Sequence, residues 1–178
     1  IAQEDDSYAF YKNIKEDNIT DEGATLPTAT FPVDMVMKAC GPVLLKYFVD
    51  DLDEVYLDDI FVVHYNTDQF DSRCAKHQDP SDITINVCLE SSQDLSGSQI
   101  VFYGERSLKG VGDGTKKESG KGDDVLFKVD CKLGACTLHW GGHPHETLPL
   151  GVGRRTNVVL TLAYKDKSKS GKNRTCYM

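Results

Sequence analysis

The triplet His77-Gln78-Asp79 is the stretch around which this chain is organised. On an extended backbone a His-x-Asp pair points both side chains to the same face, because strand side chains alternate with a period of two. A third metal ligand then has to come from a distant segment, and the run His139-Trp140-Gly141-Gly142-His143-Pro144-His145-Glu146 supplies further histidines. Such a site forms only where a later strand returns beside the first, so the pattern predicts a fold of paired strands.

Two imidazoles and one carboxylate on one face of a metal ion leave the opposite face open, which is typical of non-haem Fe(II) oxygenases. His139, His143 and His145 compete for the third ligand position, because they share one face of an alternating strand. Arg155 follows His145 by ten residues, and its guanidinium could hold the far carboxylate of an iron-bound organic acid through paired hydrogen bonds. Its neighbour Arg154 is expected to face the solvent.

The composition is that of one globular domain over residues 1–178. A hydrophobic content of 39% is enough to build a core without disulfides, and no apolar run approaches the ~18 residues of a membrane span. The net charge of −8 is uneven, because residues 1–60 carry 14 acidic and 4 basic side chains. This argues against broad nucleic-acid binding through the N-terminal part and leaves the rest open. The chain begins with Ile1, which we interpret as a processed or trimmed end.

The N-terminal third divides into an acidic arm over residues 1–30 and supporting helices over residues 31–55. Apolar residues recur at intervals of three and four from Val33 to Phe48, the pattern of an amphipathic helix. Gly41-Pro42 interrupts this pattern, and an interior proline costs ~3 kcal/mol. The sequence therefore predicts two short helices packed on a sheet.

Residues 56–164 form the predicted β core, and residues 165–178 a basic tail. Turn-rich segments separate short β-rich runs, as in an antiparallel sandwich or barrel. With metal ligands on two separate strands, the expected fold is mainly β with N-terminal helices and a double-stranded β-helix, or jelly-roll, core. The predicted strands are Tyr56–Tyr65, Asp82–Leu89, Gln99–Tyr103, Val125–Cys131, Cys136–Trp140 and Asn157–Tyr164.

Two features of the core leave alternatives open. The segment Gly104–Asp124 is rich in glycine and charge, so it is either a disordered insertion or a mobile lid over the substrate. Cys131 and Cys136 flank a predicted hairpin turn and could form a disulfide in an oxidising compartment, or remain thiols.

The run from Phe61 to Leu162 resembles the Fe(II)- and 2-oxoglutarate-dependent dioxygenases, specifically the prolyl 4-hydroxylase and lysyl hydroxylase branch. It covers about 100 of the 178 residues, and the ordered set is more specific than any one motif. The matching residues are Phe61-Val62-Val63-His64-Tyr65, His77-x-Asp79-x-Ser81-x-Ile83-Thr84-x-Asn86-Val87-x-Leu89, His139-x-Gly141, His145-Glu146-x-Leu148-Pro149 and Gly153-x-Arg155.

The resemblance implies Fe(II) held by His77, Asp79 and His145, with 2-oxoglutarate and O2 as co-substrates and room for ascorbate as a reductant. It selects His145 over the other two histidines, and it places Arg155 on the far carboxylate of 2-oxoglutarate. Further co-substrate contacts are expected from Tyr65, Thr84 and Asn86. An arginine at position 155 is closer to the lysyl hydroxylase pattern than to the animal collagen prolyl hydroxylases, which use a lysine.

By the same resemblance, the expected activity is hydroxylation of a C–H bond on a prolyl or lysyl side chain of a protein or peptide, with release of succinate and CO2. One alternative is the same chemistry on a small molecule or a nucleobase. The other is a β-barrel binding module whose metal site survives without turnover.

Overall fold

The computed structural model describes residues 9–12, 31–70, 72–104 and 125–170, and they form a mainly β structure with a single α-helix among them. The N-terminal elements are β1 (Ala9–Lys12), α1 (Val33–Tyr47) and a 3-10 helix, η1 (Leu52–Glu54). The other strands are β2 (Val55–Asn66), β3 (Cys74–His77), β4 (Ile83–Ser91), β5 (Ser96–Gly97), β6 (Ile100–Tyr103), β7 (Val125–Val129), β8 (Cys136–Trp140), β9 (His145–Thr147), β10 (Leu150–Val152) and β11 (Arg154–Tyr164).

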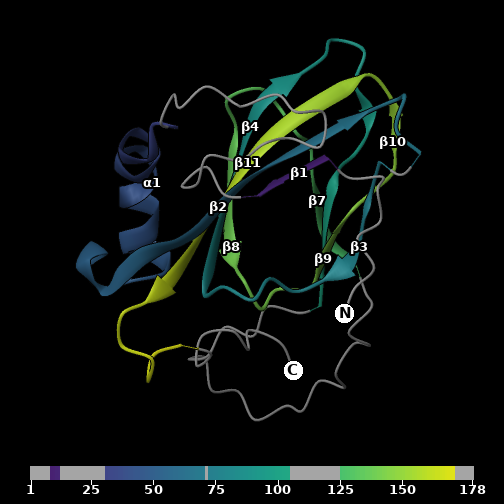
Figure 1. Cartoon of the computed structure of the whole chain (residues 1–178). Helices are drawn as coiled ribbons and strands as arrows, with labels where there is room; N and C mark the ends of the chain where they lie inside the picture. Colours follow the sequence, from purple (N-terminus) through teal and green to yellow (C-terminus); the bar gives the residue numbers. More distant parts are fainter. Residues whose placement is uncertain (1–8, 13–30, 71, 105–124, 171–178) are drawn as a thin grey trace.

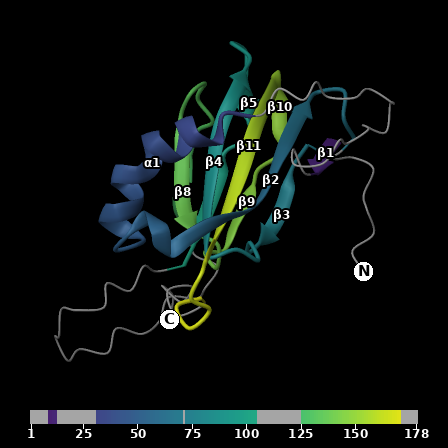
Figure 2. The same ribbon diagram turned by 60° about the vertical axis from the view of Figure 1, so that its left-hand side comes forward.

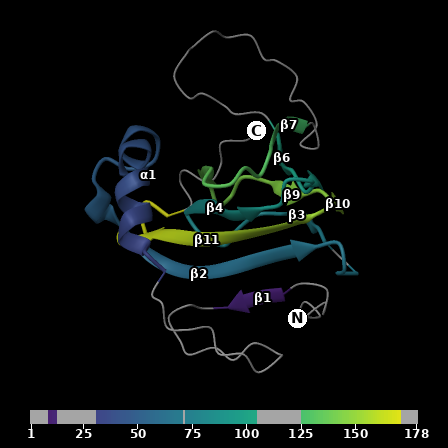
Figure 3. The same ribbon diagram turned by 90° about the horizontal axis from the view of Figure 1, so that it is seen from above.

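A five-stranded antiparallel sheet is the larger of the sheets, with strand order β1-β2-β11-β4-β8. Its centre is β11, the last strand in sequence, which pairs with β2 on one side and β4 on the other. Seen from above, β1, β2, β11 and β4 lie side by side (Figure 3). Arg155 is paired with Tyr65 of β2, so the register brings these two candidate site residues together.

A four-stranded antiparallel sheet has the order β3-β9-β6-β7, and β5 and β10 form a separate two-stranded ribbon. In Figure 1, α1 lies to the left of the larger sheet, while β3, β7 and β9 lie to its right. The pairing of β3 with β9 sets His77 opposite His145. The two strands are far apart in the chain, as the ligand pattern required.

The apolar core lies between α1 and one face of the larger sheet (Figure 2). Period-two alternation produces it, because aliphatic side chains such as Ile60 of β2, Ile85 of β4 and Leu160 of β11 are buried on that face. The buried members of this cluster are Cys40, Leu44, Val49, Val55, Ile60, Ile83, Ile85, Val158, Leu160, Leu162 and Tyr164. The residues between them point to the other face, where the candidate site lies.

The prediction of two short helices was wrong, because α1 runs unbroken through Pro42. Cys40, Gly41 and Leu44 are its buried residues, and this tertiary burial outweighs the intrinsic cost of proline. Gly41 helps, since a residue before proline without a Cβ avoids the main steric conflict of helical backbone at that position.

All six predicted strands are present, and each of their ends lies within three residues of the predicted one. Cys131 and Cys136 are free thiols. The predictions for the 104–124 insertion, for most of the 1–30 arm and for the end of the basic tail (residues 171–178) concern residues outside the described ones, except for Gly104 and the β1 backbone. Among the described residues, no helix has the length and apolar character needed to cross a membrane.

Candidate metal centre

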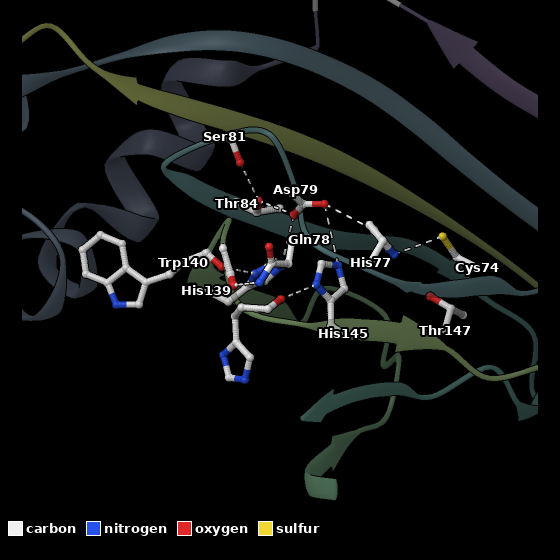
Figure 4. Close-up of polar contacts among 12 residues, drawn as sticks. Cys74, His77, Gln78, Asp79, Ser81, Thr84, His139, Trp140, His145 and Thr147 are labelled. Carbon is white, nitrogen blue, oxygen red and sulfur yellow. Dashed lines mark hydrogen bonds and ion pairs between the residues drawn. The ribbon is translucent and has the colours of Figure 1, made fainter. Parts of the chain in front are cut away.

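Three potential metal ligands converge at the end of β3 and the start of β9 (Figure 4). His77, Asp79 and His145 each offer one donor atom, and these atoms all lie within 4.8 Å of one another. Asp79 Oδ1 is 3.3 Å from His77 Nε2 and 3.8 Å from His145 Nε2. The two imidazole rings are tilted against each other with centroids 4.3 Å apart.

The backbone around Asp79 is fixed from the neighbouring loop. Asp79 N–H donates to the carbonyl of Gly141 over 2.8 Å, and Gly141 N–H donates to the carbonyl of Asp82. A Cβ at position 141 would collide with the carbonyl of Ser81. Glycine is thus required where the segment carrying the second group of histidines passes the segment carrying Asp79.

Each ligand imidazole has a carbonyl partner that fixes its tautomer. His77 Nδ1 donates to the Ala75 carbonyl over 2.8 Å, and His145 Nδ1 donates to the His143 carbonyl over 2.8 Å. In the neutral ring, the lone pair then lies on Nε2, the atom that faces Asp79. Two such imidazoles with one carboxylate match the donor set of an Fe(II) site with open positions.

The charges of the ligand groups are strongly coupled. The hydrogen bond to Asp79 raises the pKa of His77 to about 10, with a further contribution from Cys74. Burial would raise the pKa of Asp79, but the hydrogen bond with His77 and the nearby charge of His145 outweigh it and lower the pKa to about 2. Burial lowers the pKa of His145. A proton on His77 Nε2 therefore competes with a metal ion for the same atom.

The second carboxylate oxygen of Asp79 has its own partners. Thr84 Oγ1 donates to Asp79 Oδ2 over 2.5 Å, and Ser81 Oγ lies 3.0 Å from the Thr84 hydroxyl. His139 Nε2 is 3.8 Å from the same oxygen. Burial, followed by the charge of His145, lowers the pKa of His139 to about 4, so this ring is neutral. Thr84, expected as a co-substrate contact, holds the carboxylate of Asp79 in this structure.

The other histidine and arginine of the motif point elsewhere. His143 Nε2 donates to the carbonyl of Tyr103 over 3.2 Å, and His143 is not part of the three-residue donor group. Arg154 pairs with Glu90 over 2.7 Å and has 61% of its side chain exposed. Adjacent residues on a strand face opposite sides, so Arg155 points into the protein.

Arg155 is 2% exposed and is held by neutral groups. Its Nε donates to Ser98 Oγ over 2.6 Å, its Nη1 to Cys131 Sγ over 3.0 Å, and its Nη2 to Thr147 Oγ1 over 3.5 Å. The guanidinium lies 4.9 Å from the centre of the Tyr65 ring. Among the residues that the structure describes, no carboxylate forms an ion pair with Arg155, so the buried cation is suited to an anionic ligand.

A cavity of about 100 Å³ is lined both by the three potential metal ligands and by Arg155. It lies between the larger sheet and the β3-β9-β6-β7 sheet, and its lining includes all seven residues to which the resemblance gave a role in metal or co-substrate binding. Its lining is Phe61, Val63, Tyr65, Cys74, His77, Asp79, Thr84, Asn86, Ile100, His139, His145, Thr147, Arg155, Asn157 and Val159.

Sequence reasoning missed several residues at the Arg155 end of this cavity. Asn157 donates to Asn86 Oδ1 over 2.5 Å, and its own Oδ1 is buried without a hydrogen-bond partner. Asn157 and Thr147 could have been found, because they follow Arg155 and His145 by two residues on the same strand face. Ser98 and Cys131 lie outside the strands, and no periodic signal marks them.

No family model matches the chain. It is 31% identical over 130 residues to the Arabidopsis thaliana "2-oxoglutarate and iron-dependent oxygenase domain-containing protein CP2", covering 72% of this chain and 31% of that protein. It is 30% identical over 138 residues to the Mus musculus "2-oxoglutarate and iron-dependent oxygenase domain-containing protein 2", covering 76% and 34%. The chain thus spans about a third of the length of these curated relatives.

Among solved structures, the fold is similar to that of a Pseudomonas putida prolyl-4-hydroxylase. The TM-score is 0.50 at 17% identity, over 79% of this chain and 71% of that one. This likeness concerns the fold, while the two curated relatives carry the sequence similarity. Together, the relatives and the shared fold support the placement of this chain in the 2-oxoglutarate- and Fe(II)-dependent oxygenase superfamily.

Proposed function

We propose that the chain is the catalytic part of an Fe(II)- and 2-oxoglutarate-dependent dioxygenase that hydroxylates a prolyl or lysyl side chain of a protein or peptide. One observation carries the proposal: three metal-ligand side chains line the same small cavity as a buried arginine that pairs with none of the carboxylates in the described part of the chain. The family likeness of the curated relatives supports it.

In this proposal His77, Asp79 and His145 hold Fe(II). The carbonyl groups of Ala75 and His143 orient the two imidazoles, and Thr84 orients the carboxylate. When bound, the metal supplies the redox chemistry that couples oxidation of 2-oxoglutarate to succinate and CO2 with insertion of one oxygen atom of O2 into a C–H bond. Ascorbate is the proposed reductant for the metal.

Arg155 provides the second anchor of the co-substrate. Its guanidinium would pair with the far carboxylate of 2-oxoglutarate, a charge-assisted contact in a site from which water is largely excluded. Ser98, Cys131 and Thr147 fix the direction of the guanidinium. Tyr65 and Asn86, which line the same cavity, are proposed to contact the body of the co-substrate.

We also propose a topology for the two sheets, a domain range and a branch of the superfamily. The larger sheet and the β3-β9-β6-β7 sheet are proposed as the two halves of a double-stranded β-helix, within a single oxygenase domain spanning residues 1–178. The prolyl 4-hydroxylase and lysyl hydroxylase branch is favoured by the motif order and by the fold likeness to a prolyl-4-hydroxylase. A peptide substrate follows from that branch.

The test is turnover with Fe(II), O2, ascorbate and 2-oxoglutarate against panels of proline- and lysine-containing peptides. We expect succinate, together with a peptide mass gain of one oxygen atom. Asp79→Ala should abolish both signals, whereas Arg154→Ala, on the solvent side of β11, should retain them.

Other outcomes would redirect the proposal. Succinate formed only with small molecules or nucleobases would reject the peptide class and keep the oxygenase. No succinate with any substrate, and none without substrate, would favour a binding module that holds metal without turnover.

A further inference from the structure

Two cysteines meet across the contact between α1 and β8, on the side of the larger sheet away from the metal centre. The sulfurs of Cys40 on α1 and Cys136 on β8 are 3.6 Å apart, although the residues are 96 positions apart in sequence. Cys40 is 6% exposed, whereas Cys136 is exposed at the surface. The pair thus has one buried member and one that solution reagents can reach.

A second contact shows that α1 lies along β8 rather than crossing it at one point. The rings of Phe48, just after α1, and Trp140, at the end of β8, pack with centroids 4.7 Å apart. From Cys40 to Phe48 a helix advances about 12 Å, and from Cys136 to Trp140 a strand advances about 13 Å. The two distances match, so helix and strand are in register along this contact, and Figure 2 shows them side by side.

Strand β8 is an edge of the larger sheet. Among the described residues its pairing partner is β4, with Cys136 opposite Val87. Cys136, Leu138 and Trp140 alternate with Thr137 and His139, and His139 lines the cavity on the other face. A bond at Cys136 would therefore fasten the edge strand to the helix without entering the cavity.

We propose that Cys40 and Cys136 are a redox modification site, at which a soluble disulfide such as oxidised glutathione converts the two thiols into an intramolecular disulfide that clamps α1 to β8. The sulfurs need to approach by about 1.5 Å to reach bonding distance. Rotation of the two side chains can supply a movement of this size, and the exposed position of Cys136 admits the reagent.

The exchange proceeds in two balanced steps. The Cys136 thiolate attacks one sulfur of oxidised glutathione, forms a mixed disulfide and releases one glutathione. The Cys40 thiolate then attacks the Cys136 sulfur and releases the second glutathione. The two cysteines lose two electrons, oxidised glutathione gains them, and the two thiol protons end on the released glutathione molecules.

The local environment of Cys40 and Cys136 favours uncharged forms, namely the protonated Cys136 thiol and the disulfide. Partial burial, followed by the neighbouring Cys40, raises the pKa of the Cys136 thiol to about 12. The Cys136 thiol is therefore almost fully protonated at neutral pH, and the first exchange step proceeds through its small thiolate fraction. The disulfide carries no charge, so burial next to the apolar core does not penalise it.

The experiment incubates the metal-loaded protein in glutathione buffers of increasing oxidised fraction and maps disulfides by mass spectrometry without reduction. We expect one peptide that joins Cys40 to Cys136, and its loss after reduction. Because the bond closes a long loop, the melting temperature should rise by about 5–15 °C on oxidation.

The variants separate the clamp from general oxidation. Cys136→Ser should lose the joined peptide and the rise in melting temperature, whereas Cys88→Ala, which removes a buried cysteine on neighbouring β4, should keep both. Recovery of wild-type Cys136 only as a mixed disulfide with glutathione, or joined to another cysteine, would overturn the proposal. So would a joined peptide without any change in melting temperature.

Discussion

The two faces of the five-stranded sheet carry opposite kinds of side chain, although the same strands make both. On β4, Ile83 and Ile85 pack into the core under α1. Thr84 and Asn86, which alternate with them along the strand, line the cavity on the other face. On β11, Leu160 is in the core and Arg155 in the cavity. Residues that stabilise the fold and residues that line the site are therefore separate, because strand side chains alternate between the two faces.

The largest effect is expected on the cavity face, from Asp79→Ala. The variant removes the only carboxylate of the three-residue donor group, so we expect Fe(II) binding to be lost while the circular dichroism spectrum is retained. Metal content after dialysis against Fe(II) measures this. His143→Ala is the matched control, since His143 bonds to the Tyr103 carbonyl, and it should keep the metal. Loss of metal in the control alone would reject the ligand assignment.

Arg155→Ala should weaken 2-oxoglutarate binding by roughly 100-fold or more, about 3 kcal/mol, because a buried carboxylate would lose its cation. Fe(II) binding should be unchanged, and isothermal titration of each ligand separates the two effects. Arg154→Ala, one residue away on the solvent face, should leave both affinities within a factor of about five, since its ion pair with Glu90 is exposed and screened by solvent. Equal losses in the two variants would contradict the assignment.

On the core face, Leu160→Ala should lower the free energy of unfolding by about 3 kcal/mol, because Leu160 is fully buried and its loss leaves a cavity under α1. Denaturant titration measures the change. Leu89→Ala on β4 is the control: Leu89 is 42% exposed, and a change under 1 kcal/mol is expected. If Leu160→Ala also abolished Fe(II) binding in the folded protein, the two faces would not be separable.

The smallest effect concerns protons. At neutral pH, Fe(II) uptake should release about one proton, because Asp79 raises the pKa of His77 to about 10 and the metal needs the same Nε2 without its proton. Titration calorimetry in two buffers of different ionisation enthalpy measures the release. Binding heats that do not depend on the buffer would show that His77 gives up no proton.

The same pair makes the stability of the metal-free protein depend on pH. The raised pKa of His77 stabilises the fold fully below about pH 6.5, and this contribution is lost as the pH rises towards 10. The lowered pKa of Asp79 stabilises it above about pH 3.8, and this contribution is lost as the pH falls towards 2. Melting temperatures measured across this range should show both losses, and Asp79→Ala should remove them.

The sequence was sufficient for those features that repeat with a fixed period. The long strands were predicted because aliphatic residues alternate in them. The same rule allowed only one of Arg154 and Arg155 to point inward, and the Gly153-x-Arg155 motif selected Arg155. The short strands β3, β5, β9 and β10 were missed because they have two to four residues and, unlike the four-residue β6, no run of β-branched and aromatic residues. The unbroken α1 was missed because burial of Cys40 and Leu44 decides it, and burial is a property of the folded state.

The hydrogen-bond partners of Arg155 could not be predicted from the sequence either, because they are also a property of the folded state. Ser98 and Cys131 come from connections between strands, and only the closed fold brings them to the guanidinium. Thr84 was expected to contact the co-substrate. Alternation places its side chain in the cavity, but it does not indicate that the hydroxyl donates to Asp79.

The central place of β11 has a consequence for how the protein is made. During synthesis β2 and β4 emerge from the ribosome well before β11, yet β11 must lie between them before the larger sheet is complete. The larger sheet cannot be completed until residue 164 has been translated, so its folding waits for contacts that are distant in sequence. Chains that stop before β11 would leave the facing edges of β2 and β4 unpaired, and such nascent fragments would depend on chaperones.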